Sequence, residues 1–406
     1  MALVRSLSWT NVGLSEAFDK LVVPGKSGSD QRDKTTPENW RPRMEIGTDG
    51  GFVISQATNE GNTPGAEDIL RERGLDPEEW TVTSVRKGSW QRYDGDWLES
   101  VRVNVIPARA IARDFDLEQL VDEIKKWRPQ TGVKTGTGPG AYMHVGADKQ
   151  IGKKASTGGT PQSVARILEC TEKSIARLQG LQRMGLSFGT IVLPELGDHV
   201  EGNASQGGRL QGLAASDLGQ TEQVRVARRI MLQQIKAFAP YAERMVVPVV
   251  NGNHDEVTRQ VAADPADGWN VEIASAVQDA CAENPTLQNI EFRFPSSGHQ
   301  TLAVEIDGTM LGLFHGHQFR GDVKKFLDGQ SGGQTSLGGA DLWISGHYHH
   351  FKLQDIGERL WVQAPTIDPG SDWFRDRTGQ SSRPGVLTMV FGGDYDPREN
   401  ISVIPA

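Results

Sequence analysis

The part of the chain after residue 140 alternates short apolar runs with amphipathic segments, and this alternation constrains the fold more than any other feature. Amphipathic helical patterns, with apolar residues spaced three and four apart, cover residues 160–184 and 221–238. Strands followed by helices and then by a run of further strands predict an α/β fold in which two sheets pack face to face with helices outside, a four-layer α-β-β-α sandwich. The predicted strands are residues 142–146, 190–196, 245–250, 302–306, 310–314, 342–345, 351–356, 360–363 and 386–391.

Residues 1–140 differ in character, and we predict that they form a small α+β accessory region. Residues 63–74 and 117–127 have the pattern of short helices, and residues 80–85 and 97–106 alternate apolar and polar side chains around a turn, as a β-hairpin does. The stretch 129–140 is rich in Gly, Thr and Pro and predicts a linker, so the second domain is expected to span residues 141–406. The accessory region carries no chemical motif, and we expect it to be a surface for self-association or for a partner.

Composition excludes several other classes of protein. The chain has 406 residues, a formal net charge of -9 and two cysteines, Cys170 and Cys281, which we expect to be buried free thiols. It contains neither a signal-peptide pattern nor an apolar run of about 18 residues, so no membrane association and a cytoplasmic location are expected. Because the net charge is negative, no positive potential over the whole protein is expected to attract nucleic acid.

Polar residues follow the predicted strands at the point where each strand ends. Because the carboxyl ends of strands in open α/β sheets face the ligand site, these residues are expected to converge. A single Gly-Asn-His-Asp or His-x-His could be an ordinary turn, but an ordered series of five such elements predicts a shared site. The elements are Asp148, Gly197-Asp198, Gly252 to Asp255, His315, and Gly346 to His349.

The residue types of this series are those that bind divalent cations. Carboxylate, amide oxygen and imidazole suit ions such as manganese, zinc and iron, and the absence of cysteine from the series disfavours a structural zinc site. Two ions bridged by one carboxylate can hold a phosphate and activate a water for in-line attack. The series therefore predicts a two-metal site that hydrolyses phosphoesters.

The series resembles the calcineurin-like metallophosphoesterase superfamily over residues 142–391, and within that group it is most similar to SbcD-type exonucleases and related phosphodiesterases. The Gly-Asp, Gly-Asn-His-Asp and Gly-His-x-His elements are intact, and His315 fits the element with a single histidine. The first element of the family, Asp-x-His, reads Asp148-Lys149-Gln150 here. Because an amide oxygen is a weaker and harder donor than imidazole, we expect looser binding of one ion or a preference for manganese or magnesium over zinc.

The resemblance implies a role for each residue of the series. Asp198 would bridge two divalent ions, with manganese favoured and magnesium, zinc or iron as alternatives. The first ion would also be coordinated by Asp148, Gln150 and His349. The second ion would also be coordinated by Asn253, His315 and His347. His254 would be the general acid, and Asp255 would hold its loop. Water activated by the two ions would be the nucleophile, without a covalent enzyme intermediate.

The substrate is less constrained, and three functions fit the series. The first is a nuclease that cleaves nucleic acid, the second a phosphatase or cyclic-nucleotide phosphodiesterase on small substrates, and the third a catalytically weak scaffold. Arginine and aromatic residues near the site favour a nucleic-acid or nucleotide substrate because they can contact phosphates and stack on bases. The intact His254 disfavours a scaffold, which has no need of a general acid. Candidate substrate-binding residues are His199, His317, Arg320, Trp373, Arg375 and Arg377.

Overall fold

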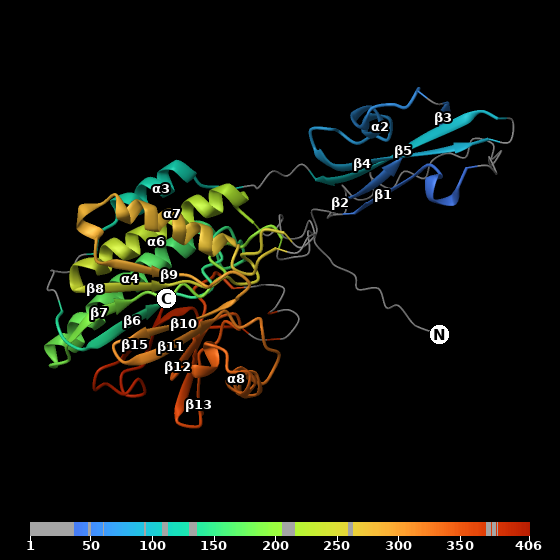
Figure 1. Ribbon diagram of the computed structural model, residues 1–406. Helices are drawn as coiled ribbons and strands as arrows, with labels where there is room; N and C mark the ends of the chain where they lie inside the picture. The colour runs from blue at the N-terminus through green and yellow to red at the C-terminus, as the bar shows by residue number, and fades with distance from the viewer. Residues whose placement is uncertain are drawn as a thin grey trace. The chain divides into compact units, whose positions relative to one another are not determined.

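The chain divides into two compact units, residues 1–108 and 109–406 (Figure 1). The division falls at residue 108 and not at 140, because helix α3 (Leu117–Lys126) packs on α6 (Gln220–Phe238) of the second unit. Helix α3 begins where the Asp116 carboxylate accepts the backbone N–H groups of Glu118 and Gln119, at 2.8 and 3.1 Å. The computed structural model describes residues 36–47, 50–59, 61–92, 95–107, 113–129, 136–204, 216–258, 263–370, 375, 379 and 381–406.

The first unit contains a five-stranded antiparallel sheet with one helix, α2 (Ala66–Glu72). The predicted hairpin is confirmed and is longer than expected, with β4 (Trp80–Gln91) paired along β5 (Trp97–Pro107). Three strands that the sequence pattern did not reveal complete the sheet: β1 (Arg43–Gly47), β2 (Gly50–Ile54) and β3 (Thr58–Asn59). Its small core joins helix and sheet through Val53, Ile69, Leu70, Leu75, Val101, Val103 and Val105.

The second unit is built on a six-stranded sheet whose central strands are parallel. The strand order is β16-β15-β6-β7-β8-β9, with β15 and β16 antiparallel to their neighbours. Helices α3, α4, α6 and α7 lie along one side of this sheet (Figure 1), and a large apolar core fills the space between them. The new elements are β6 (Gly140–Val145), α4 (Thr160–Arg183), β7 (Phe188–Val192), β8 (Arg244–Pro248), α7 (Trp269–Ala282), β9 (Ile290–Arg293), β15 (Gly385–Phe391) and β16 (Ser402–Pro405).

A second, five-stranded sheet packs against the other face of the first. Its order is β10-β11-β12-β14-β13, with β11, β12 and β14 parallel, and a separate apolar cluster that includes Met143, Val246 and Ile344 joins the two sheets. Helix α8 (Val323–Gly332) covers the outer face of this sheet over Trp343 and Trp361. The predicted mixed α/β class is confirmed. The strands are β10 (Thr301–Ile306), β11 (Thr309–Phe314), β12 (Leu342–Ser345), β13 (Lys352–Ile356) and β14 (Arg359–Gln363).

One predicted strand is shorter than expected. Residues 190–196 were expected to form one strand, but β7 ends at Val192. Pro194 has no N–H to donate to the sheet, although Leu193 and Glu195 on either side still donate to β8 carbonyls at 3.0 and 2.9 Å. Among the helices in the described ranges, none combines the length and the apolar character that a bilayer crossing demands.

Candidate metal centre

The predicted ligands lie at the carboxyl ends of parallel strands in both sheets of the second unit. Asp148, Asp198 and Asn253 follow β6, β7 and β8, while His315 and His347 follow β11 and β12. Because the two sheets pack face to face, these five loops meet. The structure therefore brings these residues together, and their role as metal ligands stays a prediction.

Glycines in the motifs allow the ligand loops to approach one another closely. A Cβ atom on Gly252 would lie 2.0 Å from Oδ1 of Asp198, and one on Gly346 would lie 2.7 Å from Oδ2 of Asp148. Both distances are shorter than any real carbon contact, so a larger residue would displace the ligand. The Gly of Gly-Asn-His-Asp and the Gly of Gly-His-x-His thus have a steric role in the centre.

The backbone of the centre is unusual at the ligands themselves. The non-glycine residues with a positive φ, among those described, include five predicted ligands: Asp148 (50°), Gln150 (39°), Asp198 (56°), His347 (70°) and His349 (61°). The left-handed region costs a non-glycine residue about 1–3 kcal/mol. Backbone strain is therefore concentrated at this site, as is common where the backbone must aim a functional side chain.

Asp198, His315 and His347 form the tightest cluster of potential ligands. One ligand atom from each lies within 4.8 Å of the other two. Nε2 of His315 is 3.1 Å from Oδ2 of Asp198 and 3.2 Å from Nδ1 of His347. The Nδ1 atom of His315 faces the Leu196 carbonyl at 2.8 Å. Since a carbonyl only accepts, Nδ1 carries the proton and Nε2 is left to coordinate a metal.

The charges around this cluster stabilise a cation. Burial disfavours the His315 imidazolium, but the Asp198 carboxylate outweighs burial and raises the pKa of His315 to about 9. Burial and the charge of His315 together lower the pKa of His347 to about 4. Burial would raise the pKa of Asp198, but the positive charges of His315 and His254 outweigh it and lower that pKa well below its ordinary value. One carboxylate and two imidazoles in a buried pocket that favours positive charge fit a divalent transition ion.

Asn253, the fourth predicted ligand of the second ion, belongs to the same loop as His254, the predicted general acid. Asn253 is half-buried, and its side-chain oxygen is shielded from solvent. The backbone N–H of the next residue, His254, donates to Oδ1 of Asp198 at 2.8 Å. The Asn253 loop is thereby held against the cluster.

Asp255 was expected to hold the loop of the predicted acid in place, and its carboxylate joins two loops of the candidate centre. Its Oδ2 atom accepts the backbone N–H groups of Asp198 at 2.7 Å and Gly252 at 2.8 Å. Burial, followed by the negative charge of Asp198, raises the pKa of Asp255 to about 7. Asp255 thus ties the Gly-Asp loop to the Gly-Asn-His-Asp loop, and both loops carry ligands.

The first predicted ligand set is arranged differently. Asp148 accepts the backbone N–H of His347, at 3.0 Å for the shorter contact, and its Oδ1 lies 3.6 Å from Nε2 of His349. The side-chain oxygen of Gln150 accepts from Nζ of Lys153 at 2.5 Å, and the same ammonium is paired with Asp368. Asp148, Gln150 and His349 are neighbours, but the side-chain oxygen of Gln150 is hydrogen-bonded to the Lys153 ammonium.

Lys153 and Asp368 were missed by sequence reasoning. Asp368 could have been found, since it follows strand β14 just as the other acids and histidines follow theirs. It is fully buried, and its Oδ2 lies 3.6 Å from Nδ1 of His349. Lys153 lies in the loop after β6, and no local pattern marks it as part of the site.

His199 does not have the expected position. It was predicted to line a substrate cleft, but its ring is fully buried, with Nε2 2.5 Å from Oε2 of Glu195. The ammonium of Lys149 lies 2.9 Å from the same oxygen, and it is also buried. The three side chains form a buried charged group that adjoins Asp148 and Asp198 in the chain, which gives His199 a structural role.

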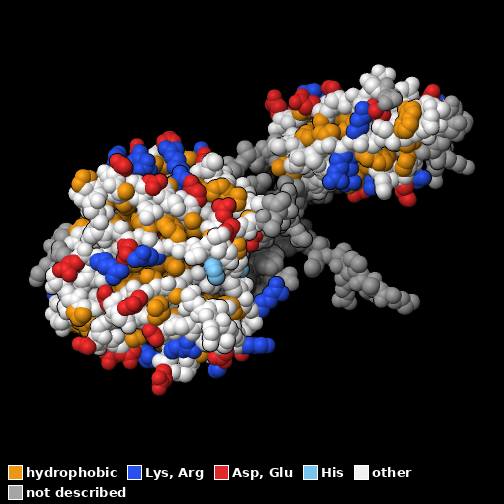
Figure 2. Space-filling view, viewed as in Figure 1, with side chains coloured by type: hydrophobic (Ala, Val, Ile, Leu, Met, Phe, Trp, Pro, Cys, Tyr) orange, Lys and Arg blue, Asp and Glu red, His pale blue; other side chains and the backbone are white. Residues whose placement is uncertain are grey.

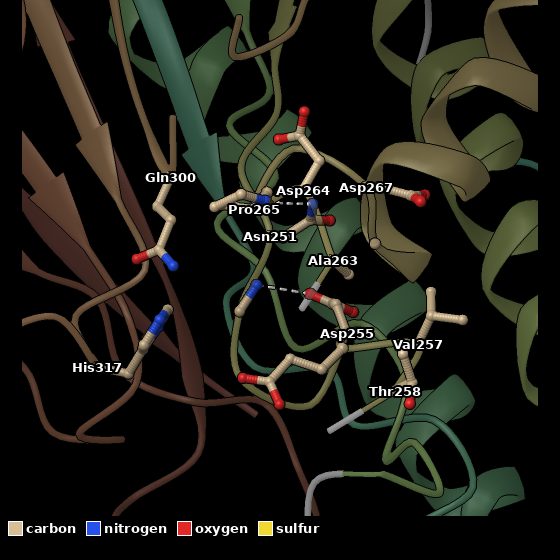
Figure 3. A pocket seen from close by; sticks show the side chains of 13 residues that line it. Asn251, Asp255, Val257, Thr258, Ala263, Asp264, Pro265, Asp267, Gln300 and His317 are labelled. Atoms are coloured by element: carbon tan, nitrogen blue, oxygen red, sulfur yellow. Dashed lines mark hydrogen bonds between the residues drawn. The ribbon is translucent and has the colours of Figure 1, made fainter. Parts of the chain in front are cut away.

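The remaining substrate candidates are placed unequally. His317 lines a cavity of about 430 Å³, and Figure 3 shows His317 and Gln300 across this cavity from Asn251 and Asp255. Arg320 is exposed in the loop after β11. Arg375 is also exposed, 3.4 Å from the hydroxyl of Ser156. The other two candidates, Trp373 and Arg377, lie outside the described residues.

Comparison with known proteins gives matches among solved structures alone. No protein-family model matches the chain, and no curated protein matches it. A novel archaeal phosphodiesterase is 12% identical, over 65% of this chain and 99% of its own, with a TM-score of 0.31. Vps29 of Entamoeba histolytica in complex with zinc is 13% identical, over 65% and 98%, with a TM-score of 0.28. A predicted phosphoesterase of Streptococcus pneumoniae TIGR4 is 13% identical, over 66% and 91%, with a TM-score of 0.28.

Two of these names, a phosphodiesterase and a predicted phosphoesterase, are of the kind that the motif series predicts. At such identities and TM-scores the likeness carries no functional argument of its own. The function proposed below therefore rests on the residues of the metal centre.

Proposed function

We propose that this protein is a metal-dependent phosphoesterase that hydrolyses phosphodiester bonds, with nucleic acid as the favoured substrate. The observation that supports this most directly is the cluster of buried Asp198 and His315 with half-buried His347, to which the His254 backbone is attached through the Asp198 carboxylate. A catalytically weak scaffold would need neither a cation-stabilising cluster nor an imidazole held beside it.

A divalent ion would be held by Asp198, Asn253, His315 and His347, a mixture of oxygen and nitrogen donors that suits manganese, zinc or iron. When bound, such an ion supplies Lewis-acid polarisation of a phosphoryl oxygen and lowers the pKa of water. The fixed tautomer of His315 keeps its Nε2 atom directed at the cluster, because Nδ1 is engaged by the Leu196 carbonyl.

His254 is placed to move the proton that the leaving group requires. Its Nδ1 atom lies 2.6 Å from the Glu201 carbonyl, which can only accept, so Nδ1 carries a proton. Nε2 is therefore the atom that exchanges a proton with the leaving oxygen. The Glu201 carboxylate lies 3.6 Å from the same Nδ1 atom. The His254 side chain keeps 17% of its surface exposed, so a substrate can reach it.

Nucleic acid is favoured over small substrates by exposed basic side chains beside the site. Arg320 is exposed in the loop that carries His315 and His317, and Lys325 is exposed at the start of α8. Elsewhere on the face shown in Figure 2, basic and acidic side chains are interspersed. Exposed basic side chains of this kind can contact phosphates without a basic field over the whole protein.

The activity can be tested with the manganese-loaded protein and bis(4-nitrophenyl) phosphate, an activated phosphodiester. We expect turnover that EDTA abolishes and that Asp198→Ala reduces to background. His254→Ala is expected to lower kcat by about 10²–10⁴ on a substrate with a poor leaving group. His299→Ala, at an exposed histidine before β10, is the matched control and should retain full activity.

A substrate panel separates the candidate functions. Labelled single- and double-stranded DNA and RNA would be compared with cyclic mononucleotides and a phosphopeptide. Cleavage of the polynucleotides supports a nuclease, whereas cleavage of only the small substrates refutes it. If no phosphoester is turned over by metal-loaded protein, the scaffold function replaces the enzymatic one.

A further inference from the structure

The loop after β6 places a lysine ammonium inside the first predicted ligand set. Nζ of Lys153 lies 2.5 Å from Oε1 of Gln150 and forms an ion pair with Oδ2 of Asp368. The Lys153 side chain is 12% exposed, and that of Asp368 is fully buried. Such a pair is held in one position, unlike a surface ion pair that moves freely in water.

This ammonium is joined to the rest of the centre through a chain of close contacts. The same Asp368 oxygen lies 3.6 Å from Nδ1 of His349, and Nε2 of that ring lies 3.6 Å from Oδ1 of Asp148. Oδ1 of Asp148 is in turn 3.9 Å from Nε2 of His315. The lysine cation is therefore linked to the metal-binding cluster through Asp368, His349 and Asp148.

The identity of residue 150 agrees with this arrangement. An amide oxygen accepts a hydrogen bond from an ammonium, whereas a neutral imidazole nitrogen at that position would be the better ligand for a transition ion. The Gln150 oxygen accepts a hydrogen bond from the Lys153 ammonium, and a metal ion at the same oxygen would have to lie against a like charge. A glutamine at 150 and a lysine at 153 thus suit each other and disfavour an ion between them.

We propose that Lys153 takes the place of the first metal ion, so that the centre holds one divalent ion at Asp198, His315 and His347 and a fixed ammonium at Gln150 and Asp368. An ammonium has three N–H donors, and two of them are directed at Gln150 and Asp368. The third binds a non-bridging oxygen of the substrate phosphate. The phosphate-binding role rests on the proposed function, whereas the number of metal ions does not.

The metal count is the primary test. Protein stripped with EDTA and reloaded with Mn²⁺ would be analysed by titration calorimetry and by elemental analysis. We expect one ion per chain in the wild type and two in the double variant Gln150→His/Lys153→Ala. Electron paramagnetic resonance would show an isolated Mn²⁺ ion in the former and a coupled pair in the latter. Two ions per wild-type chain, or a folded double variant that binds no more than wild type, would overturn the proposal.

Phosphate binding tests the role of the ammonium without turnover. Inorganic phosphate would be titrated into the Mn²⁺-loaded wild type, Lys153→Met and the control Lys154→Met, which changes an exposed neighbouring lysine. Loss of a charge-assisted hydrogen bond should weaken phosphate binding at least about tenfold in Lys153→Met, and the control should bind as the wild type does. Equal affinities of all three folded proteins would refute the role of Lys153.

These outcomes separate the inference from the proposed function. A wild-type protein with two Mn²⁺ ions that hydrolyses phosphodiesters sinks the inference and leaves the function standing. One ion per chain and lysine-dependent phosphate binding without any hydrolysis leaves the inference standing and removes the function.

Discussion

Replacement of Glu195 by glutamine should destabilise the second unit in a manner that depends on pH. The Glu195 carboxylate is buried and accepts from Lys149 at 2.9 Å, and Nε2 of His199 lies 2.5 Å from it. Glutamine has nearly the same volume and can still accept from the lysine. The substitution therefore removes the charge with little change in packing and leaves the Lys149 ammonium buried without a counterion.

The expected loss can be worked from the pKa of the carboxyl group. Burial alone would raise the pKa of Glu195, but the charges of Lys149 and His199 outweigh it and lower that pKa from 4.5 to about 2. This difference corresponds to about 3 kcal/mol of stability at pH 7, close to the roughly 3–5 kcal/mol expected when one partner of a buried pair is removed.

The sign of the pH dependence follows from the lowered pKa. The stabilising contribution of Glu195 is fully present above about pH 4.5 and is lost as the pH falls through about 2, because the folded state must then take up the proton. At pH 3 about 2 of the 3 kcal/mol should already be lost. The difference between wild type and Glu195→Gln should thus be large at pH 7 and small near pH 3.

Urea unfolding in EDTA, followed by circular dichroism from pH 7 to pH 3, measures this difference. Glu169→Gln is the matched control, since Glu169 forms an exposed pair with Lys173 on α4, and its unfolding free energy should equal that of the wild type at every pH. A destabilisation by Glu195→Gln that is the same at pH 7 and pH 3 would show that packing, and not charge, makes Glu195 important.

Further substitutions test the steric and hydrogen-bonding arguments. Gly252→Ala should abolish tight Mn²⁺ binding in calorimetry, because its Cβ would lie 2.0 Å from the Asp198 carboxylate, whereas Gly329→Ala, which meets no atom within 4 Å, should bind Mn²⁺ normally. Tyr142→Phe should lower the unfolding free energy by about 1 kcal/mol, since the buried hydroxyl donates to the Ser174 carbonyl at 2.9 Å; an unchanged value would show that this bond makes no net contribution.

Much of the centre was predictable because each ligand follows a strand. Parallel strands end at a common edge, so Asp148, Asp198 and His315 could be brought together from the order of the elements alone. The position of Asp255 between two loops also followed from its motif. The sequence pattern therefore predicted which ligands lie near one another, because topology determines this and detailed packing does not.

The charged partners of these ligands were not predictable in the same way. Lys153 and Asp368 are 215 positions apart, and their pairing depends on the course of two irregular loops. His199 follows a ligand directly and was expected near the substrate, yet it turns inward to Glu195. Such pairings form because a charge that becomes buried when the sheets pack requires a counterion.

The left-handed backbone at the ligand residues lowers the stability of the protein, although function requires the side chains at these positions. At Asp198 and His347, two ligands of the proposed metal ion that have a positive φ, glycine is the residue that the backbone accepts without strain, but glycine supplies no ligand. Substitution to glycine there should therefore relieve about 1 kcal/mol or more of strain while it destroys the centre. A mutational scan scored by protein abundance should favour glycine at these two positions, whereas one scored by activity should reject it, which would locate the metal centre without a structure.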